Sequence, residues 1–221
     1  MVKGEHSVMN YPRIGELVSR RPGLADSAKD IETVCDLIIG SYQRGGKVLV
    51  CGNGGSCADA GHIAGELMKG FHKKRPLLGE LKGRLTQHGG VEFADKLQTP
   101  LRAFDLTAMV ALITATANDI DADCIYAQQV IGFADPDDIF IGISTSGNSR
   151  SVHFAAIAAK ALGAVLVGLT GTDGGIMHKS GLYDVVIRVP ESVTYRIQEE
   201  HIAVYHAVCA TVEDVFFEEQ T

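Results

Sequence analysis

The sequence contains no tryptophan, and aromatic residues make up only 6% of its 221 positions. It has no apolar run near the roughly 18 residues that a membrane-spanning helix needs. The first fifteen residues also lack the apolar stretch of a secretory signal. We therefore expect no membrane association and a cytoplasmic location.

The five cysteines include no C-x-x-C pair, and their number is odd. This excludes a disulfide framework and a structural zinc site of the thiolate type, and it favours a reducing compartment. Each cysteine is expected to be a small buried apolar residue. They are Cys35, Cys51, Cys57, Cys124 and Cys209.

The chain also lacks the basic balance of a general nucleic-acid binder, since its net charge is −7. The charge is unevenly spread, however. Residues 69–102 hold eight basic and three acidic side chains, a net charge of +5, which leaves −12 for the rest of the chain. This basic segment is either a solvated loop with a chance cluster or a rim that attracts an anionic substrate.

The main feature of the sequence is the alternation of short apolar segments with helical patterns. The predicted strands are 47–51, 139–143, 164–169 and 184–189, with a weaker one at 102–106. Helical patterns lie between them near 56–69, 107–132 and 149–162, and the last spans about 194–217. Such alternation predicts an α/β fold, a doubly wound three-layer sandwich around a five-stranded parallel sheet.

The domain organisation follows from the same pattern. Residues 1–45 read as a helical N-terminal segment, and 46–221 as one α/β domain. Within the domain, residues of about 72–101 are rich in glycine and proline and lack a clear periodicity. We expect a long loop or insertion there, and loops of that length are usually functional or disordered.

Three small, polar loops follow predicted strands. They are Gly52-Asn53-Gly54-Gly55-Ser56, then Ser144-Thr145-Ser146-Gly147-Asn148-Ser149, then Thr170–Gly175. Ligands of open α/β sheets bind at the carboxyl ends of strands, where helix N-termini offer free N–H donors to anions. The loops lack the dinucleotide and P-loop fingerprints, so they predict a cradle for a small phosphate ester.

Imidazole and carboxylate groups lie close to this cradle in the sequence. His62 and Glu66 are four residues apart and share one helix face, while the last helix carries Gln198 and His206. These groups could bind a divalent metal. Because Gln198 and His206 are eight residues apart, about 12 Å along a helix, both reach one ion only if their side chains lean together, the helix bends, or one comes from a neighbouring subunit. With or without a metal, Glu66 and His206 could exchange protons with a sugar phosphate.

These motifs resemble the SIS (sugar isomerase) domain family, whose fold is flavodoxin-like, and within it the phosphoheptose isomerases. The resemblance rests on the glycine loop with His62 and Glu66, on the serine loop, and on Arg196-Ile197-Gln198-Glu199 with His206. It covers roughly residues 10–217 and is weakest over 72–101. It implies a cytoplasmic homotetramer with sites at subunit interfaces, in which the N-terminal helices pack between subunits. The implied reaction converts sedoheptulose 7-phosphate to glycero-manno-heptose 7-phosphate for heptose biosynthesis.

The same resemblance implies a role for individual residues. Glu66 and His206 would be the catalytic base and acid, and one zinc ion per site would be bound by His62, Glu66, Gln198 and His206. The substrate-binding residues implied by the family, together with the loops, are Asn53, Gly54, Gly55, Ser56, Glu66, Asn118, Asp119, Ser144, Thr145, Ser146, Ser149 and Gln198.

Two alternatives to this activity remain open. The chain could isomerise another sugar phosphate, or it could be a non-catalytic SIS module that senses a sugar phosphate or binds a replication initiator. A pure sensor needs the serine loop but not the carboxylate and histidine set, which is complete here. The sequence departs in two places from the shorter members of the family, and both bear on the identity of the sugar. The stretch between Glu66 and Asn118 is longer, and Tyr195 stands in place of an acidic residue.

Overall fold

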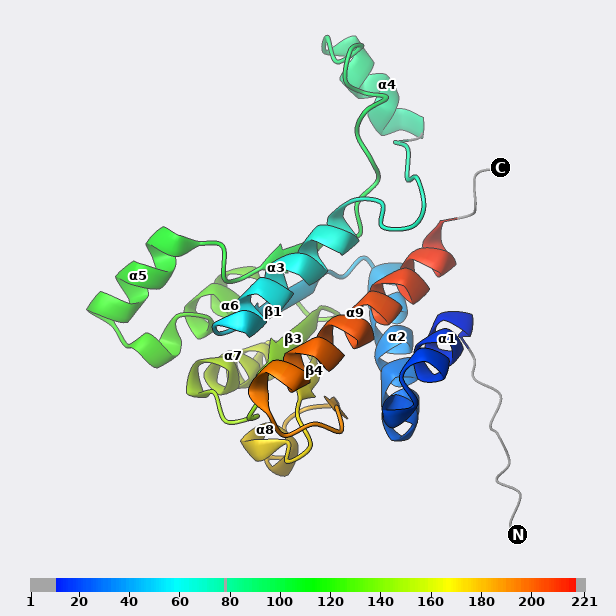
Figure 1. Ribbon diagram of the computed structural model, residues 1–221. Coiled ribbons are helices and arrows are strands. Elements are labelled where there is room, and N and C mark those ends of the chain that lie inside the picture. Colours follow the sequence, from blue (N-terminus) through cyan, green and yellow to red (C-terminus); the bar gives the residue numbers. More distant parts are fainter. Residues whose placement is uncertain (1–10, 78, 218–221) are drawn as a thin grey trace.

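The computed structural model describes residues 11–77 and 79–217, which form a three-layer α/β structure (Figure 1). Its sheet contains β1 (Val48–Gly52), β2 (Ala103–Asp105), β3 (Ile139–Ile143), β4 (Val165–Thr170) and β5 (Val185–Arg188). All neighbouring strands are parallel, in the order β2-β1-β3-β4-β5. The predicted fold class and all five predicted strands are confirmed.

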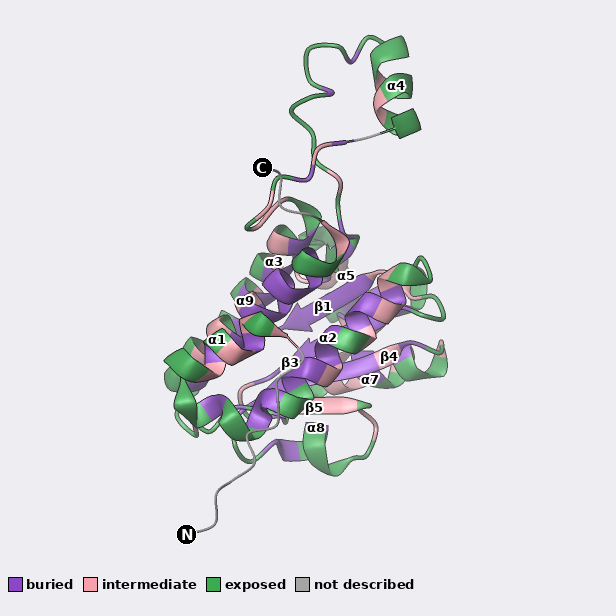
Figure 2. Cartoon of the chain, turned by 90° about the vertical axis from the view of Figure 1, so that its right-hand side faces the viewer, coloured by how far each residue is buried: buried purple, intermediate pink, exposed green. Residues whose placement is uncertain are grey.

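The central strands are buried on both faces, which explains their nearly continuous apolar sequences. Every residue of β1 and β3 is buried, and Val48 pairs in register with Ile139. Successive side chains point to opposite faces, so Val48 joins one hydrophobic core and Leu49 the other. Figure 2 shows these strands enclosed between helical layers.

The two cores divide the helices between the faces of the sheet. The first core includes side chains of α1 (Pro12–Arg20), α2 (Ala28–Gln43), α3 (Gly55–Met68) and α9 (Thr194–Phe216). The second includes side chains of α6 (Ala127–Phe133), α7 (Arg150–Ala161) and α8 (Gly175–Lys179). Helices α3 and α9, distant in sequence, lie side by side (Figure 1).

The N-terminal segment is helical as predicted over its described part, with η1 (Pro22–Ser27) between α1 and α2. Ile14 and Leu17 are fully buried in the same core as the sheet. Within one chain, α1 and α2 therefore complete this core. Their packing between subunits stays a prediction, and residues 1–10 lie outside the described residues.

Two predictions about helices were wrong. The single pattern over 107–132 is broken into α5 (Val110–Asp119), η2 (Ala122–Cys124) and α6. The break arises because the Asp121 carboxylate accepts a hydrogen bond from the Asp123 N–H and starts a new turn. The insertion, expected to be irregular, contains α4 (Gly79–Gln87). Two glycines had weakened its helical pattern.

The segment 72–101, here called the arm, projects from the body of the molecule (Figure 1). Its base is closed by an antiparallel bridge between Pro76 and Gln98 and by a hydrogen bond from Thr99 Oγ1 to the Pro76 carbonyl. The arm is therefore a folded projection whose two ends are hydrogen-bonded to each other, and it is not an open loop.

One buried titratable group predicts how stability depends on pH. His201 of α9 is fully buried, and burial lowers the pKa of its imidazole to about 4, although a contact with the Thr170 backbone raises it. Between about pH 6.5 and pH 4 the unfolded chain therefore binds a proton that the folded chain resists. We expect the free energy of unfolding to fall by about 3 kcal/mol across this window.

Urea unfolding at a series of pH values measures this effect. His201→Leu should flatten the curve between pH 6.5 and pH 4, since leucine has no proton to bind. A variant whose curve has the same slope as that of the parent protein would show that other groups cause the acid sensitivity.

Candidate active site

The glycine and serine loops meet at the carboxyl ends of β1 and β3, which are neighbours in the sheet. Asn53 Nδ2 donates to Ser149 Oγ at 2.7 Å and to Ser151 Oγ at 3.0 Å. The Tyr126 hydroxyl lies 2.7 Å from the Gly52 carbonyl oxygen and 3.0 Å from Asn53 Oδ1, sharing its one proton between them, and so orients the amide. The two loops therefore form one polar surface at the start of α3 and α7, where the positive ends of the helix dipoles favour an anion.

The third loop closes against the second through glycines. Gly147 has a φ of +66°, and a side chain there would place its Cβ 2.1 Å from the Gly174 carbonyl oxygen. The Gly171 N–H donates to the Thr145 carbonyl at 3.1 Å. The chain therefore needs glycine at position 147, both for its left-handed backbone and for the close contact.

The predicted cradle residues differ in their access to solvent. Asn53, Gly54, Gly55 and Ser146 are exposed, and Thr145 and Ser149 are half-buried. Ser56 and Ser144 are buried, so their side chains support the loops from beneath. Contact of the cradle residues with a substrate stays a prediction.

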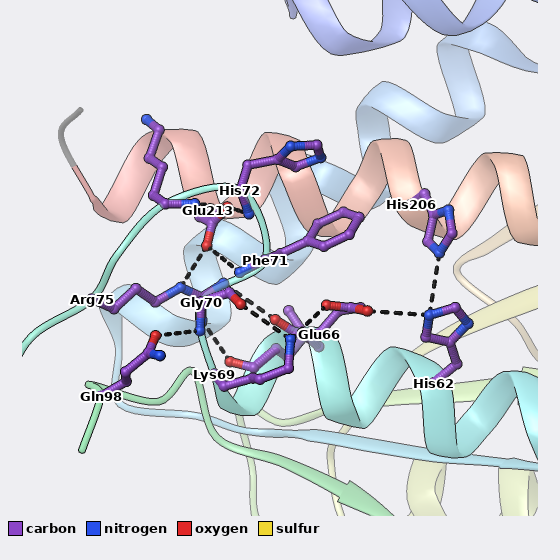
Figure 3. Close-up of polar contacts among 12 residues, drawn as sticks. His62, Glu66, Lys69, Gly70, Phe71, His72, Arg75, Gln98, His206 and Glu213 are labelled. Carbon is purple, nitrogen blue, oxygen red and sulfur yellow. Dashed lines mark hydrogen bonds and ion pairs between the residues drawn. The ribbon is translucent and has the colours of Figure 1, made fainter. Parts of the chain in front are cut away.

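A row of proton-carrying side chains joins α3 and α9. Figure 3 shows Glu66, His62 and His206 pointing toward one another. Glu66 Oε1 lies 3.1 Å from His62 Nε2, which lies 3.4 Å from His206 Nε2. Lys69 Nζ donates to the other Glu66 oxygen at 3.3 Å. The structure thus brings the predicted base and acid to the two ends of one short row.

A second series of hydrogen bonds, through Tyr205 to Asp59, holds the other ring nitrogen of His62. His62 Nδ1 lies 2.8 Å from the Tyr205 hydroxyl, which donates to Asp59 Oδ1 at 3.3 Å. With the Tyr205 proton directed at Asp59, the hydroxyl accepts the His62 proton, so the fitting tautomer carries it on Nδ1. The lone pair of Nε2 then faces Glu66 and His206, the orientation that a metal-binding histidine requires.

Burial and neighbouring charge shift the titration of this site. Burial and then the adjacent His62 lower the pKa of His206. Burial raises the pKa of Asp59, partly opposed by the hydrogen bond from Tyr205 and by the charge of His62. The imidazole of His206 is therefore favoured in its neutral form, which can give up one ring proton and accept another.

A buried ion pair fixes the chain just after Glu66. Arg75 Nε donates to Glu213 Oε1 at 2.7 Å, and both side chains are fully buried. The Glu213 carboxylate also accepts from the backbone N–H groups of Phe71 and His72 (Figure 3). Burial raises the pKa of Glu213, but these hydrogen bonds and Arg75 outweigh it and lower the pKa overall.

This pair also holds the end of α3, where Arg75 donates to the carbonyls of Leu67 and Glu66 at 2.7 Å and 3.2 Å. Sequence reasoning missed both Arg75 and Glu213. The available signal was the position of Glu213 on the apolar face of the last helix, four residues after Cys209.

Gln198 lies apart from this row. Its amide covers Gly55 so closely that a Cβ at position 55 would be 2.1 Å from Gln198 Nε2. Helix α9 is continuous from Thr194 to Phe216, so Gln198 and His206 stay about 12 Å apart along its axis. Within one chain the structure therefore groups three of the four predicted metal ligands and places the fourth beside the glycine loop.

Asn118 and Asp119 are also apart from the row. Both are exposed at the end of α5, where Asn118 Nδ2 donates to Asp119 Oδ1 at 2.7 Å. Among residues 11–77 and 79–217, no hydrogen bond joins either side chain to the glycine or serine loop. Their predicted contact with substrate stays a prediction.

The row has donors that suit zinc. Within the described residues, no three His, Cys, Asp or Glu side chains are already arranged around one point as metal ligands. However, ligands about 2.0–2.1 Å from a tetrahedral zinc ion are separated by about 3.3–3.4 Å. The separations of 3.1 Å and 3.4 Å are close to that value. Two of the three donor separations therefore match those around such an ion, and the donor types suit zinc.

Comparisons with known proteins identify the family. A model of the SIS domain matches residues 18–98 and 91–171. A phosphoheptose isomerase of Roseiflexus sp. (strain RS-1) is 38% identical over 200 residues, which cover 90% of this chain and 89% of that protein. The chain belongs to the SIS-domain family and to its phosphoheptose isomerases. It is therefore an enzyme, an isomerase.

Further relatives agree with this assignment. A phosphoheptose isomerase of Aneurinibacillus thermoaerophilus is 40% identical over 85% of this chain and 82% of its own. The solved phosphoheptose isomerase of Neisseria gonorrhoeae matches with a TM-score of 0.69 and 31% identity, over 91% of this chain and 92% of that one. The solved phosphoheptose isomerase of Francisella tularensis matches with a TM-score of 0.72 and 29% identity, over 90% of this chain and 95% of that one. No helix of the described SIS-domain chain is long and apolar enough to cross a membrane.

Proposed function

We propose that the protein is a sugar-phosphate isomerase that interconverts sedoheptulose 7-phosphate and glycero-manno-heptose 7-phosphate. The observation that carries this proposal is the row of Glu66, His62 and His206. A ketose and its aldose differ only in the placement of hydrogen on two neighbouring carbons and their oxygens, so the reaction needs a base and an acid within reach of both. The relatives named phosphoheptose isomerase support the choice of a heptose.

In the proposed reaction, Glu66 takes a proton from carbon 1 of the ketose while His206 gives a proton to the carbonyl oxygen at carbon 2. The resulting enediol keeps its carbon skeleton. Glu66 then returns its proton to carbon 2, and His206 takes the proton of the oxygen on carbon 1, which becomes the aldehyde. Both residues end in their starting states, as catalysis requires. Lys69 Nζ donates to Glu66 at 3.3 Å and so helps to hold the carboxylate in place.

The phosphate is assigned to the glycine and serine loops. Ser149, whose hydroxyl accepts a hydrogen bond from Asn53, would donate its own proton to a phosphate oxygen, together with the N–H groups at the starts of α3 and α7. These loops carry no lysine or arginine in their sequences. The cradle therefore relies on dipoles and hydrogen bonds, which suits a substrate that must leave after each turnover.

We further propose that one zinc ion is bound by His62, Glu66 and His206, with Tyr205 fixing the orientation of His62. A bound zinc ion would polarise the sugar carbonyl and so ease removal of the neighbouring proton. The role of Gln198 as a fourth ligand rests on the resemblance alone.

Self-association is part of the proposal. The glycine loop and Glu66 occupy opposite ends of α3, about 16 Å apart along its axis. Gln198 is likewise separated from the other three predicted ligands. Both separations support a homotetramer whose sites draw residues from two copies. We place this enzyme in the cytoplasm, where its five free cysteines fit a reducing environment.

A coupled assay with sedoheptulose 7-phosphate tests the reaction and the metal together. The chelated protein should lose most of its turnover, and added zinc should restore it, because imidazole and carboxylate ligands bind this ion well. The same protein without chelation serves as the control. Binding of the sugar phosphate with no turnover under any condition would refute the isomerase and favour a sensor.

A further inference from the structure

Asp59 is a buried carboxylate with a single hydrogen-bond donor. Its side chain on α3 is only 5% exposed. Among the described residues, the one hydrogen bond that it accepts comes from the Tyr205 hydroxyl, at 3.3 Å to Oδ1. Its other oxygen, Oδ2, is buried without a partner in the same part of the chain. A buried carboxylate is strongly unfavourable without a donor, so Asp59 depends on Tyr205.

The Tyr205 hydroxyl has one proton and two neighbouring acceptors. It lies 3.3 Å from Asp59 Oδ1 and 2.8 Å from His62 Nδ1. If the proton pointed at His62, Asp59 would keep no donor at all, and breaking the last contact of a buried charge is a large cost. The proton is therefore directed at Asp59, although the contact with His62 is the shorter one.

The direction of this hydrogen bond decides what Glu66 faces. Because the hydroxyl oxygen accepts from His62 Nδ1, the Nε2 atom carries a lone pair. This lone pair lies 3.1 Å from Glu66 Oε1, so two acceptors meet with no proton between them. Glu66 still has Lys69 as a donor at 3.3 Å. The arrangement therefore costs Glu66 less than the loss of its only donor would cost Asp59.

The space between His62 and Glu66 consequently suits a cation better than a proton. His206 Nε2 can donate to His62 Nε2 across a long contact of 3.4 Å, but His62 has no proton to give to Glu66 Oε1. Figure 3 shows the three side chains pointing toward one another. Neutral imidazole nitrogens and a carboxylate oxygen that offer lone pairs to one place are the donors that a divalent metal requires.

We propose that Asp59 is a positioning residue that acts through Tyr205 to keep the proton of His62 on Nδ1, so that the site takes a divalent cation in place of a proton. Asp59 acts on the ring nitrogen that faces away from Glu66 and is not itself a ligand. Outer groups of this kind typically contribute 10–100-fold to metal affinity. The inference rests on the zinc site proposed above, but not on the identity of the sugar.

The first test measures zinc affinity of the full chain by competition with a chromophoric chelator. Tyr205→Phe keeps the ring and removes the hydroxyl, so it should weaken zinc binding 10–100-fold. The matched control is Tyr183→Phe. It removes a buried hydroxyl that has no hydrogen-bond partner among the described residues and that packs against the other core. This control should bind zinc as tightly as the parent protein.

The second test reverses the hydrogen bonds with Asp59→Asn. The new amide should donate to the Tyr205 oxygen, because the opposite orientation would bury two N–H protons at the unpartnered position of Oδ2. The hydroxyl would then donate to His62 Nδ1, and the proton of His62 would move to Nε2. Nitrogen NMR of the metal-free rings at about pH 8, where imidazole is neutral, should show Nδ1–H in the parent and Nε2–H in the variant. Zinc binding of the variant should weaken at least tenfold.

Asp36→Asn is the control for this reversal, since Asp36 accepts from the Tyr11 hydroxyl outside the site, and it should keep the tautomer and affinity of the parent. A parent protein with its His62 proton on Nε2 would overturn the proposal, even if Asp59→Asn failed to fold. So would zinc affinities of Tyr205→Phe and Asp59→Asn within threefold of the parent. Because both measurements are made without substrate, Asp59-dependent zinc binding with no turnover would refute only the proposed reaction.

Discussion

Replacing Glu66 with glutamine should lower kcat for sedoheptulose 7-phosphate isomerisation by about 10²–10⁴-fold, the usual contribution of a positioned base. Glutamine keeps the shape of the side chain and can still contact His62 and Lys69. It cannot take a proton from carbon, however. Steady-state kinetics with the zinc-loaded protein measure the loss, and KM should change much less than kcat if the loops bind the phosphate.

Glu16→Gln is the matched control, since Glu16 is an exposed carboxylate of α1 whose ion pairs with Arg13 and Arg20, at 4.0 Å and 3.7 Å, lie far from the site in sequence. It should retain full turnover. The zinc content of Glu66→Gln must be measured beside the rate, because a carboxamide is a weaker ligand than a carboxylate. Turnover within threefold of the parent protein in the zinc-loaded Glu66→Gln variant would exclude Glu66 as the base.

Replacing Glu213 with glutamine should lower the free energy of unfolding by about 3–5 kcal/mol, the usual cost of breaking a buried ion pair. The loss is large because Arg75 would remain fully buried with no opposite charge. The backbone N–H groups of Phe71, His72 and Lys73 would also lose part of their shared acceptor. Urea unfolding measures the change as a lower midpoint with an unchanged slope.

Asp214→Asn is a control at the neighbouring position. Asp214 pairs with Arg13 and Lys73 at the surface, and exposed pairs contribute about 1 kcal/mol or less. A second control, Arg75→Met with Glu213→Leu, removes both charges and should regain much of the lost stability. A loss below 1 kcal/mol in Glu213→Gln would mean that the pair does not hold the base of the arm.

Glu213→Gln should also slow catalysis, because it would disturb the position of Glu66 without removing a reacting group. Arg75 binds the Glu66 carbonyl as well as Glu213, so loosening the pair would leave the end of α3 less fixed. The arm begins at the same place, at His72, one residue after Phe71, whose ring lies 5.3 Å from that of His206. The buried pair therefore links the order of the arm to that of the site.

Much of the fold could be predicted because its signals are local. Each strand is a short apolar segment between turn residues, and burial on both faces selects for that pattern. The pairing of His62 with Glu66 follows from helix geometry alone, since residues four apart share a face. The three polar loops were predictable for the same reason, because parallel strands deliver their carboxyl ends to one edge of the sheet.

Predictions failed where local signals competed. The apolar pattern over 107–132 continues through Ile120 and Ile125, but the cap formed by Asp121 stops the helix there. In the arm, the Leu81 and Leu85 pair is a weak helical signal beside the glycines at 79 and 83. Helix periodicity reports an average over a segment and cannot see a single capping hydrogen bond.

The sequence by itself determined the strand pattern, the polar loops, the His62 and Glu66 pair and the basic segment 69–102. Only the tertiary structure decided that α3 and α9 run side by side, so that His206 meets His62 while Gln198 meets Gly55. It also decided the pairing of Arg75 with Glu213, which are 138 residues apart. The physical reason is that periodicity and capping act within a few residues, whereas contacts between helices depend on how the whole core packs.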